Sequence, residues 1–117
     1  MNVIITGAAG QVGSALRSAI WPEGFAIIPR TRQETDITSA IDLGKTLQRL
    51  APDIIVNCAA YTAVDQAEHC PDQARAANCQ AVEYLSNTCA GLQIPLVHLS
   101  TDYVFDGNKN MPYTESD

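Results

Sequence analysis

The feature that most constrains this chain is a run of spaced glycines between an apolar segment and an amphipathic one. The apolar run "NVIIT" (residues 2–6) is typical of a strand buried on both faces, and residues 11–20 are typical of a helix. Between them lie Gly7, Gly10 and Gly13. In this context the first glycine permits a tight turn, the second lets backbone amides approach a pyrophosphate, and the third lets helix and strand pack closely. The loop therefore predicts a dinucleotide site.

The rest of the chain alternates between apolar runs and amphipathic segments. We expect further strands at residues 24–29, 53–59 and 94–100, a very short one at 34–36, and helices from Thr38 or Ser39 to Leu50 and over 71–91. Strands that are apolar throughout and separated by helices indicate a mostly parallel sheet with right-handed crossovers. The predicted fold is thus a doubly wound α/β (Rossmann) fold, forming one domain over residues 1–117.

Composition excludes several classes of function. The net charge of −6 argues against nucleic acid as a partner, and no apolar stretch approaches the roughly 20 residues of a membrane span. The four cysteines form no C-x-x-C pair and no zinc spacing with the two histidines, so we expect no metal site and small buried thiols in a reducing compartment. With the first strand at residue 2 and no visible leader, a cytoplasmic location is expected.

The tip of the second strand bears on the choice of dinucleotide. An acidic residue there favours NAD, whereas arginine favours the 2′-phosphate of NADP. This chain has Arg30 and Arg32 at the tip and no acidic residue before Glu34. The two guanidinium groups form a plausible phosphate clamp, although solvated loop arginines remain the alternative. NADP(H) is therefore the favoured cofactor, with NAD(H) as the alternative.

Several motifs together resemble one family. The chain carries "GAAGQVG", "DIT", "PDIIVNCAAYTAVDQAE" and "LSTDYVFDG", and in these it resembles the dTDP-4-dehydrorhamnose reductases of the extended short-chain dehydrogenase/reductases. The resemblance implies reduction of dTDP-4-dehydro-L-rhamnose to dTDP-L-rhamnose by NADPH or NADH. It also implies a dTDP-sugar as substrate and leaves room for a homodimer of the full-length protein.

The resemblance also assigns roles to residues. It implies a cofactor-binding set of Gly7, Gly10, Gln11 and Val12 at the pyrophosphate, Asp36 and Ile37 beside the adenine, and Ala59, Ala60 and Tyr61 along the ribose and nicotinamide. Asn78 corresponds to a residue that braces the neighbouring strand. If residues 34–36 form the third strand, the family's order places strand 53–58 beside the first strand, and a ligand is expected at the switch point between them.

The stretch after the last strand corresponds to the reacting end of the site. The resemblance makes Thr101 the catalytic hydroxyl that hydrogen-bonds the 4-keto oxygen of the sugar. It makes Asp102 a residue that orders the site, although a turn-forming aspartate is the alternative. Tyr103, Val104 and Phe105 would border the sugar nucleotide.

One part of the family's machinery is missing. Hydride addition to a ketone requires an acid, and the family uses a tyrosine followed four residues later by a lysine. No tyrosine of this chain is followed by lysine at that spacing. We therefore expect the chain to be the amino-terminal half of a longer reductase, inactive alone. Two alternatives remain: a non-catalytic nucleotide-binding subunit resembling the regulatory subunit of methionine adenosyltransferase, or another nucleotide-sugar epimerase or dehydratase.

Overall fold

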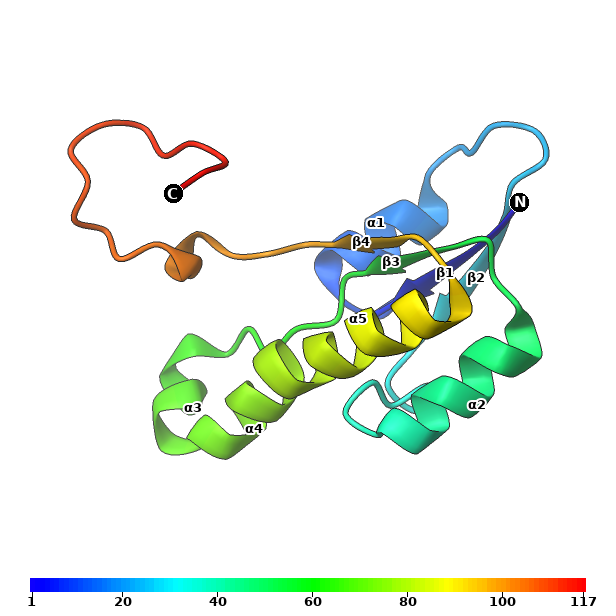
Figure 1. Cartoon of the computed structure of the whole chain (residues 1–117), viewed down its shortest axis with the longest axis horizontal. Helices are drawn as coiled ribbons and strands as arrows, with labels where there is room; N and C mark the ends of the chain where they lie inside the picture. Colours follow the sequence, from blue (N-terminus) through cyan, green and yellow to red (C-terminus); the bar gives the residue numbers. More distant parts are fainter.

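A four-stranded parallel sheet forms the centre of the molecule. The computed structural model describes residues 1–117 and contains strands β1 (Asn2–Thr6), β2 (Ala26–Arg30), β3 (Ile54–Asn57) and β4 (Leu96–His98). Their order across the sheet is β2-β1-β3-β4, and every neighbouring pair is parallel (Figure 1). The expected Rossmann-type architecture is confirmed. So is the placement of β3 beside β1, which puts the switch point between these two strands.

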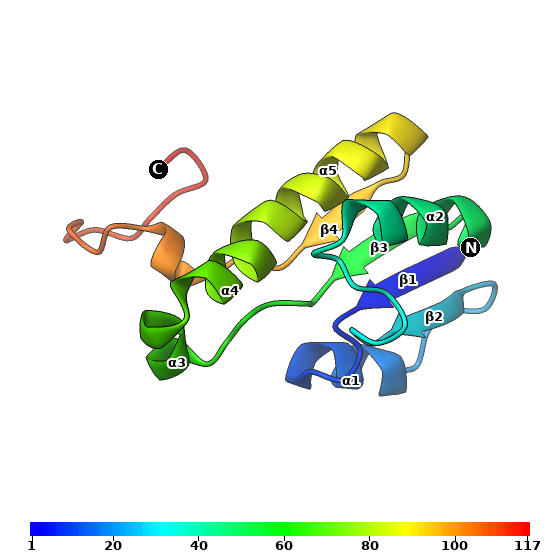
Figure 2. The same ribbon diagram turned by 90° about the horizontal axis from the view of Figure 1, so that it is seen from below.

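Helices cover both faces of the sheet (Figure 2). The helices are α1 (Gln11–Ser18), α2 (Ala40–Leu50), α3 (Val64–His69), α4 (Pro71–Arg75) and α5 (Ala81–Leu92), with a π-helical turn, η1 (Ala76–Gln80), joining the last two. α1 packs on β1 and β2, while α2 and α5 pack against each other on the opposite face. None of the helices is both long enough and apolar enough to cross a membrane.

The hydrophobic core lies between the sheet and the pair α2 and α5. Leu43 and Leu47, four residues apart on α2, are fully buried against Ile4 of β1, Ile55 of β3 and Leu85 of α5. The i, i+4 spacing places both leucines on one helix face. Because these side chains come from four elements, the core fixes the sheet and the helices as one unit.

Several local expectations were wrong. Residues 34–36 form no strand: the amides of Glu34 and Thr35 both donate to the carbonyl of Thr31, which makes a turn. The expected helix over residues 71–91 is present from Pro71 to Leu92, but the π turn η1 within it was not foreseen, and neither was α3. The first helix, expected over residues 11–20, ends at Ser18, and Ile20 beyond it is fully exposed. Of the four thiols, only that of Cys89 is buried, and that of Cys79 is exposed.

A buried polar network ties the carboxyl ends of three strands together. The hydroxyl of Thr6 donates to Asn57 Oδ1 at 2.5 Å, and the amide of Ala59 donates to the same oxygen at 3.2 Å. Asn57 Nδ2 lies 2.9 Å from Nδ1 of His98. Asn57 is fully buried, so it depends on these partners to offset its desolvation. The network fixes how the chain leaves β3.

Removing this network tests its contribution to stability. Asn57→Leu leaves the buried Thr6 hydroxyl without its acceptor, and an unsatisfied buried polar group costs about 1–3 kcal/mol. We expect the free energy of unfolding, measured by urea titration, to fall by about that amount. The exposed Asn87→Leu on α5 is the matched control and should stay within about 0.5 kcal/mol. Equal stability of the two variants would show that the network contributes nothing.

Candidate functional site

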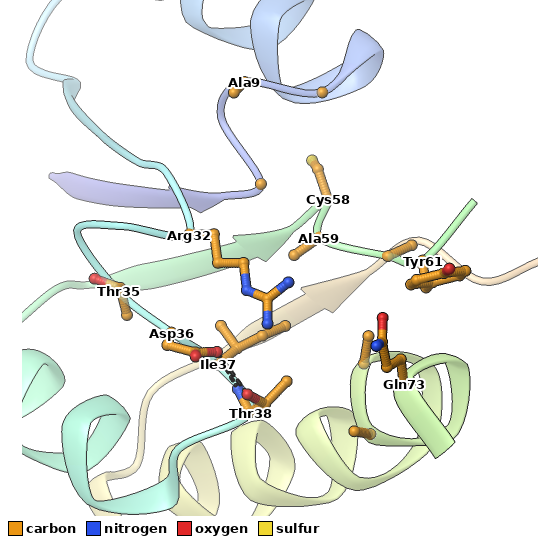
Figure 3. A pocket seen from close by; sticks show the side chains of 15 residues that line it. Ala9, Arg32, Thr35, Asp36, Ile37, Thr38, Cys58, Ala59, Tyr61 and Gln73 are labelled. Carbon is orange, nitrogen blue, oxygen red and sulfur yellow. Dashed lines mark hydrogen bonds between the residues drawn. The ribbon is translucent and has the colours of Figure 1, made fainter. Parts of the chain in front are cut away.

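A cavity of about 310 Å³ opens at the carboxyl ends of the strands (Figure 3). It lies where the segments after β1, β2 and β3 meet helix α4 and the turn η1. The residues that line it are Gly7, Ala9, Gly10, Arg32, Thr35, Asp36, Ile37, Thr38, Cys58, Ala59, Ala60, Tyr61, Gln73, Ala76 and Ala77. In doubly wound sheets ligands occupy this edge, next to the switch point.

The glycine loop forms one wall and has almost no room for side chains. Gly7 has φ +65°, and a Cβ on it would lie 2.6 Å from the backbone of Ala59. A Cβ on Gly13 would lie 2.8 Å from Ala8 Cα, so helix α1 packs directly on the loop. A Cβ on Gly10 would meet only the carbonyl of Gly7, at 3.3 Å. Gly7 and Gly13 are therefore required by the fold itself, while Gly10 leaves open space toward the cavity.

The same loop presents the start of helix α1. Gly10 is the N-cap residue, and no side chain caps this helix. The first amides of an α-helix have no partners within the helix and carry its positive partial charge. Gln11 and Val12, exposed in the first turn, do not line the cavity. Their backbone amides, at the helix start, carry the positive partial charge that attracts anions in other helices.

The two arginines at the tip of β2 lie in different environments. Arg30 is held by the turn: its Nε donates to Thr35 Oγ1 at 3.0 Å and its guanidinium donates to the carbonyl of Glu34 at 2.9 Å. Its own carbonyl accepts from the amide of Ala8, which joins the turn to the glycine loop. Arg32 has no hydrogen bond within the chain and extends toward the middle of the cavity (Figure 3). Of the two arginines predicted to clamp a phosphate, Arg32 thus lines the cavity and Arg30 does not.

Asp36 also lines the cavity, and its carboxylate accepts two hydrogen bonds from Thr38. Its Oδ1 accepts from the hydroxyl of Thr38 at 2.7 Å and from the Thr38 amide at 3.0 Å (Figure 3). The Thr38 hydroxyl has the largest effect in lowering the pKa of Asp36, and the positive charge of Arg32 lowers it further. Ile37, between Asp36 and Thr38 in the sequence, is buried and belongs to the hydrophobic core. Asp36 is therefore an ionised hydrogen-bond acceptor at neutral pH.

Ala59, Ala60 and Tyr61 line the cavity just after β3, where a side chain of the π turn holds them. Asn78 accepts from the amide of Tyr61 at 2.7 Å and donates to the carbonyl of Tyr61 at 2.9 Å. A π turn adds one residue to a helical turn and often occurs at functional sites. The paired bonds fix the backbone of this segment against the helix.

The segment assigned to catalysis and substrate binding lies outside the cavity. Thr101 caps a 3₁₀ turn, η2 (Asp102–Val104): its hydroxyl accepts from the Tyr103 amide and donates to Asp102 Oδ1, both at 3.3 Å. The side chains of Tyr103 and Val104 are 78% and 66% exposed, and the chain beyond β4 runs away from the sheet (Figure 1). Phe105 instead stacks on Tyr113 with ring centroids 4.1 Å apart.

Several lining residues were not foreseen. Gln73, Ala76 and Ala77 belong to α4 and η1. These elements are far from the glycine loop in the sequence, and no motif indicated that they would lie beside it. Thr35 was hidden because residues 34–36 were assigned to a strand. Cys58 could have been named, since it immediately precedes Ala59 at the end of β3; partial burial raises the pKa of its thiol. The short side chains of Ala76 and Ala77 take up little of the cavity volume.

The parallel strand order and the glycine loop together define a Rossmann-like α/β protein. A family model described as the RmlD substrate binding domain matches residues 1–117, and the chain belongs to this family. The resemblance indicated by the sequence motifs is thereby confirmed.

Individual relatives agree with this result. The dTDP-4-dehydrorhamnose reductase of Sinorhizobium fredii is 44% identical over the whole chain. A crystal structure of a dTDP-4-dehydrorhamnose reductase from Clostridium acetobutylicum matches all of the chain and 42% of its own length with a TM-score of 0.93 and 36% identity. The Bacillus anthracis enzyme, in complex with NADP, matches 93% of the chain and 39% of its own length with a TM-score of 0.87 and 39% identity. The chain spans 39% of the Sinorhizobium relative.

The hydrogen bond from Thr38 to Asp36 gives a testable pH dependence. Because the folded-state pKa of Asp36 is lowered, its ionised form stabilises the fold above the unfolded-state pKa of about 3.9, and this contribution is lost as pH falls through the folded-state pKa. Thr38→Val removes the bond with the largest effect. We expect the pKa of Asp36, followed by carboxyl-carbon NMR, to rise, and acid unfolding to begin at higher pH.

Thr88→Val, a similar exchange on α5, is the control and should leave the pKa of Asp36 unchanged. An unchanged pKa in Thr38→Val would contradict the assignment of the shift to the Thr38 hydroxyl.

Proposed function

We propose that this chain forms the cofactor-binding part of a cytoplasmic dTDP-4-dehydrorhamnose reductase, which reduces dTDP-4-dehydro-L-rhamnose to dTDP-L-rhamnose with a nicotinamide dinucleotide. The observation that carries the proposal is the cavity at the switch point between β1 and β3, lined by Gly7, Ala9 and Gly10 of the loop that leads into the uncapped start of α1. The 44% identity to a reductase of that name supports the choice of substrate.

The residues present fit the diphosphate and adenosine part of such a cofactor. Gly10 leaves its side of the loop open for a phosphate, and the amides at the start of α1 offer hydrogen-bond donors. Asp36 and Ile37 supply an acceptor and an apolar surface suited to adenine, and Ala59 to Tyr61 continue the wall past β3. When bound, the reduced nicotinamide would supply a hydride.

NADP(H) is the favoured cofactor, because of Arg32. Its guanidinium extends into the cavity without a hydrogen-bond partner in the chain, so it is free to donate hydrogen bonds to a phosphate. The related Bacillus anthracis enzyme was crystallised with NADP. Arg30 would act differently, by holding the turn that presents Arg32.

Thr101 is proposed as the hydroxyl that donates to the 4-keto oxygen of the sugar, turning its proton there from Asp102 Oδ1. Asp102 would order the site, and Tyr103, Val104 and Phe105 would border the sugar nucleotide. Their exposed position at the end of β4, on the same sheet edge as the cavity, suits contact with a substrate. The proton that completes reduction must come from another acid, since none of these groups is paired with a lysine.

The first test concerns the loop. Gly10→Ala keeps an allowed backbone, φ −76°, but places a methyl group where the phosphate approaches. We expect NADPH binding by titration calorimetry to weaken by about tenfold or more, roughly 1.4 kcal/mol. Gly44→Ala on α2, where a Cβ meets nothing within 4 Å, is the matched control and should bind normally. If both folded variants bound NADPH normally, the glycine loop would not be part of the cofactor site.

The second test concerns turnover. A positioned acid contributes about 10²–10⁴-fold to rate, and this chain has no tyrosine–lysine pair to supply one. We expect no measurable NADPH oxidation when the 117-residue chain is mixed with dTDP-4-dehydrorhamnose. In the longer reductase that we propose contains it, Thr101→Val should lower kcat without changing NADPH affinity. Robust turnover by the 117-residue chain would refute the claim that the proton donor lies outside it.

A further inference from the structure

The donors at the tip of β2 are already occupied by a carboxylate of the chain itself. Glu34 Oε2 accepts from the amide of Thr31 at 2.8 Å and from the hydroxyl of Thr31 at 2.9 Å. These two bonds have the largest effects in lowering the pKa of Glu34, so the group is ionised at neutral pH. A backbone amide and a hydroxyl just past β2 are the kind of donors that would bind a ribose 2′-phosphate.

The charges at this tip also cancel. Arg30 and Arg32 carry two positive charges, and Glu34 and Asp36 carry two negative ones within the same turn. The charge of Arg30 lowers the pKa of Glu34, and the charge of Arg32 lowers that of Asp36, so each cation is close to an anion. A phosphate dianion that approaches Arg32 therefore meets a group of side chains with no net positive charge, one of which is the negatively charged Glu34.

The turn lies beside the expected path of the cofactor. The carbonyl of Arg30 accepts from the amide of Ala8 in the glycine loop, which fixes the two segments side by side. Arg32, one residue past Thr31, extends into the cavity. A ribose whose diphosphate sits on the glycine loop would place its 2′ position near this tip.

We propose that Glu34 is a specificity-determining residue, which occupies the Thr31 donors and opposes the 2′-phosphate, and so limits the preference for NADP(H) over NAD(H). The proposal rests on the proposed cofactor site. Glu34 would occupy the place of a phosphate oxygen, and a 2′-phosphate must displace it or bind beside it. NAD(H), with a 2′-hydroxyl, meets no such charge.

The test compares Glu34→Gln with the wild-type chain. The glutamine amide oxygen can still accept from Thr31, so the turn is kept while the charge is lost. Titration calorimetry at fixed ionic strength would use NADPH, NADH, 2′,5′-ADP and 5′-ADP as ligands. We expect about fivefold tighter binding of the two 2′-phosphorylated ligands, with NADH and 5′-ADP changed by less than about twofold.

Two further variants make the outcome specific. Glu23→Gln removes the same charge from the exposed loop before β2, at the opposite end of that strand, and should leave all four affinities unchanged. Glu34→Ala removes both charge and acceptor and should also favour the 2′-phosphorylated ligands. Unchanged ratios in both Glu34 variants, or a loss shared by all four ligands, would overturn the role of Glu34. Failure of the wild-type chain to bind any of them would instead overturn the proposed cofactor site, and this inference with it.

Discussion

The close approach of the glycine loop to the end of β3 is the constraint on which the rest of the structure depends. Gly7 adopts a left-handed conformation with no space for a Cβ, because the backbone of Ala59 fills that place. L-residues with side chains rarely adopt such a φ, and here a side chain would also collide with backbone. The contact holds the ends of β1 and β3 together, and residues that follow both strands line the cavity at this switch point.

Polar interactions then set the shape of the cavity edge. Asn57, buried between Thr6 and His98, determines the direction in which the chain leaves β3. Asn78 fixes Tyr61 a few residues further on, from a π turn that interrupts the long helix. On the other side, Arg30 and Glu34 order the turn after β2. Each wall of the cavity is thus held by side chains that do not themselves line it.

Much of this arrangement could be predicted from the sequence. The parallel sheet and the glycine loop follow from apolar runs and glycine spacing, because these reflect local chain geometry. The position of β3 beside β1 was implied only by the strand order of the family that the chain resembles. The separate environments of Arg30 and Arg32 could not be predicted, since both lie in one short polar stretch and only the turn at Thr31 distinguishes them. Likewise, Gln73 and the alanines of η1 reach the cavity only through tertiary packing. The roles proposed for residues 101–105 come from the resemblance, because local sequence patterns do not show what an exposed segment contacts.

The most direct test of the central claim, a cofactor site at the β1–β3 switch point, is chemical-shift mapping of the ¹⁵N-labelled chain with NADPH. We expect the largest shifts at residues 7–13, 32–38 and 58–61, the three segments that follow strands β1, β2 and β3 and contain most of the residues lining the cavity. The amides of α2 that face away from the cavity should be unaffected. Absence of shifts, or shifts confined to residues 99–117, would contradict the claim.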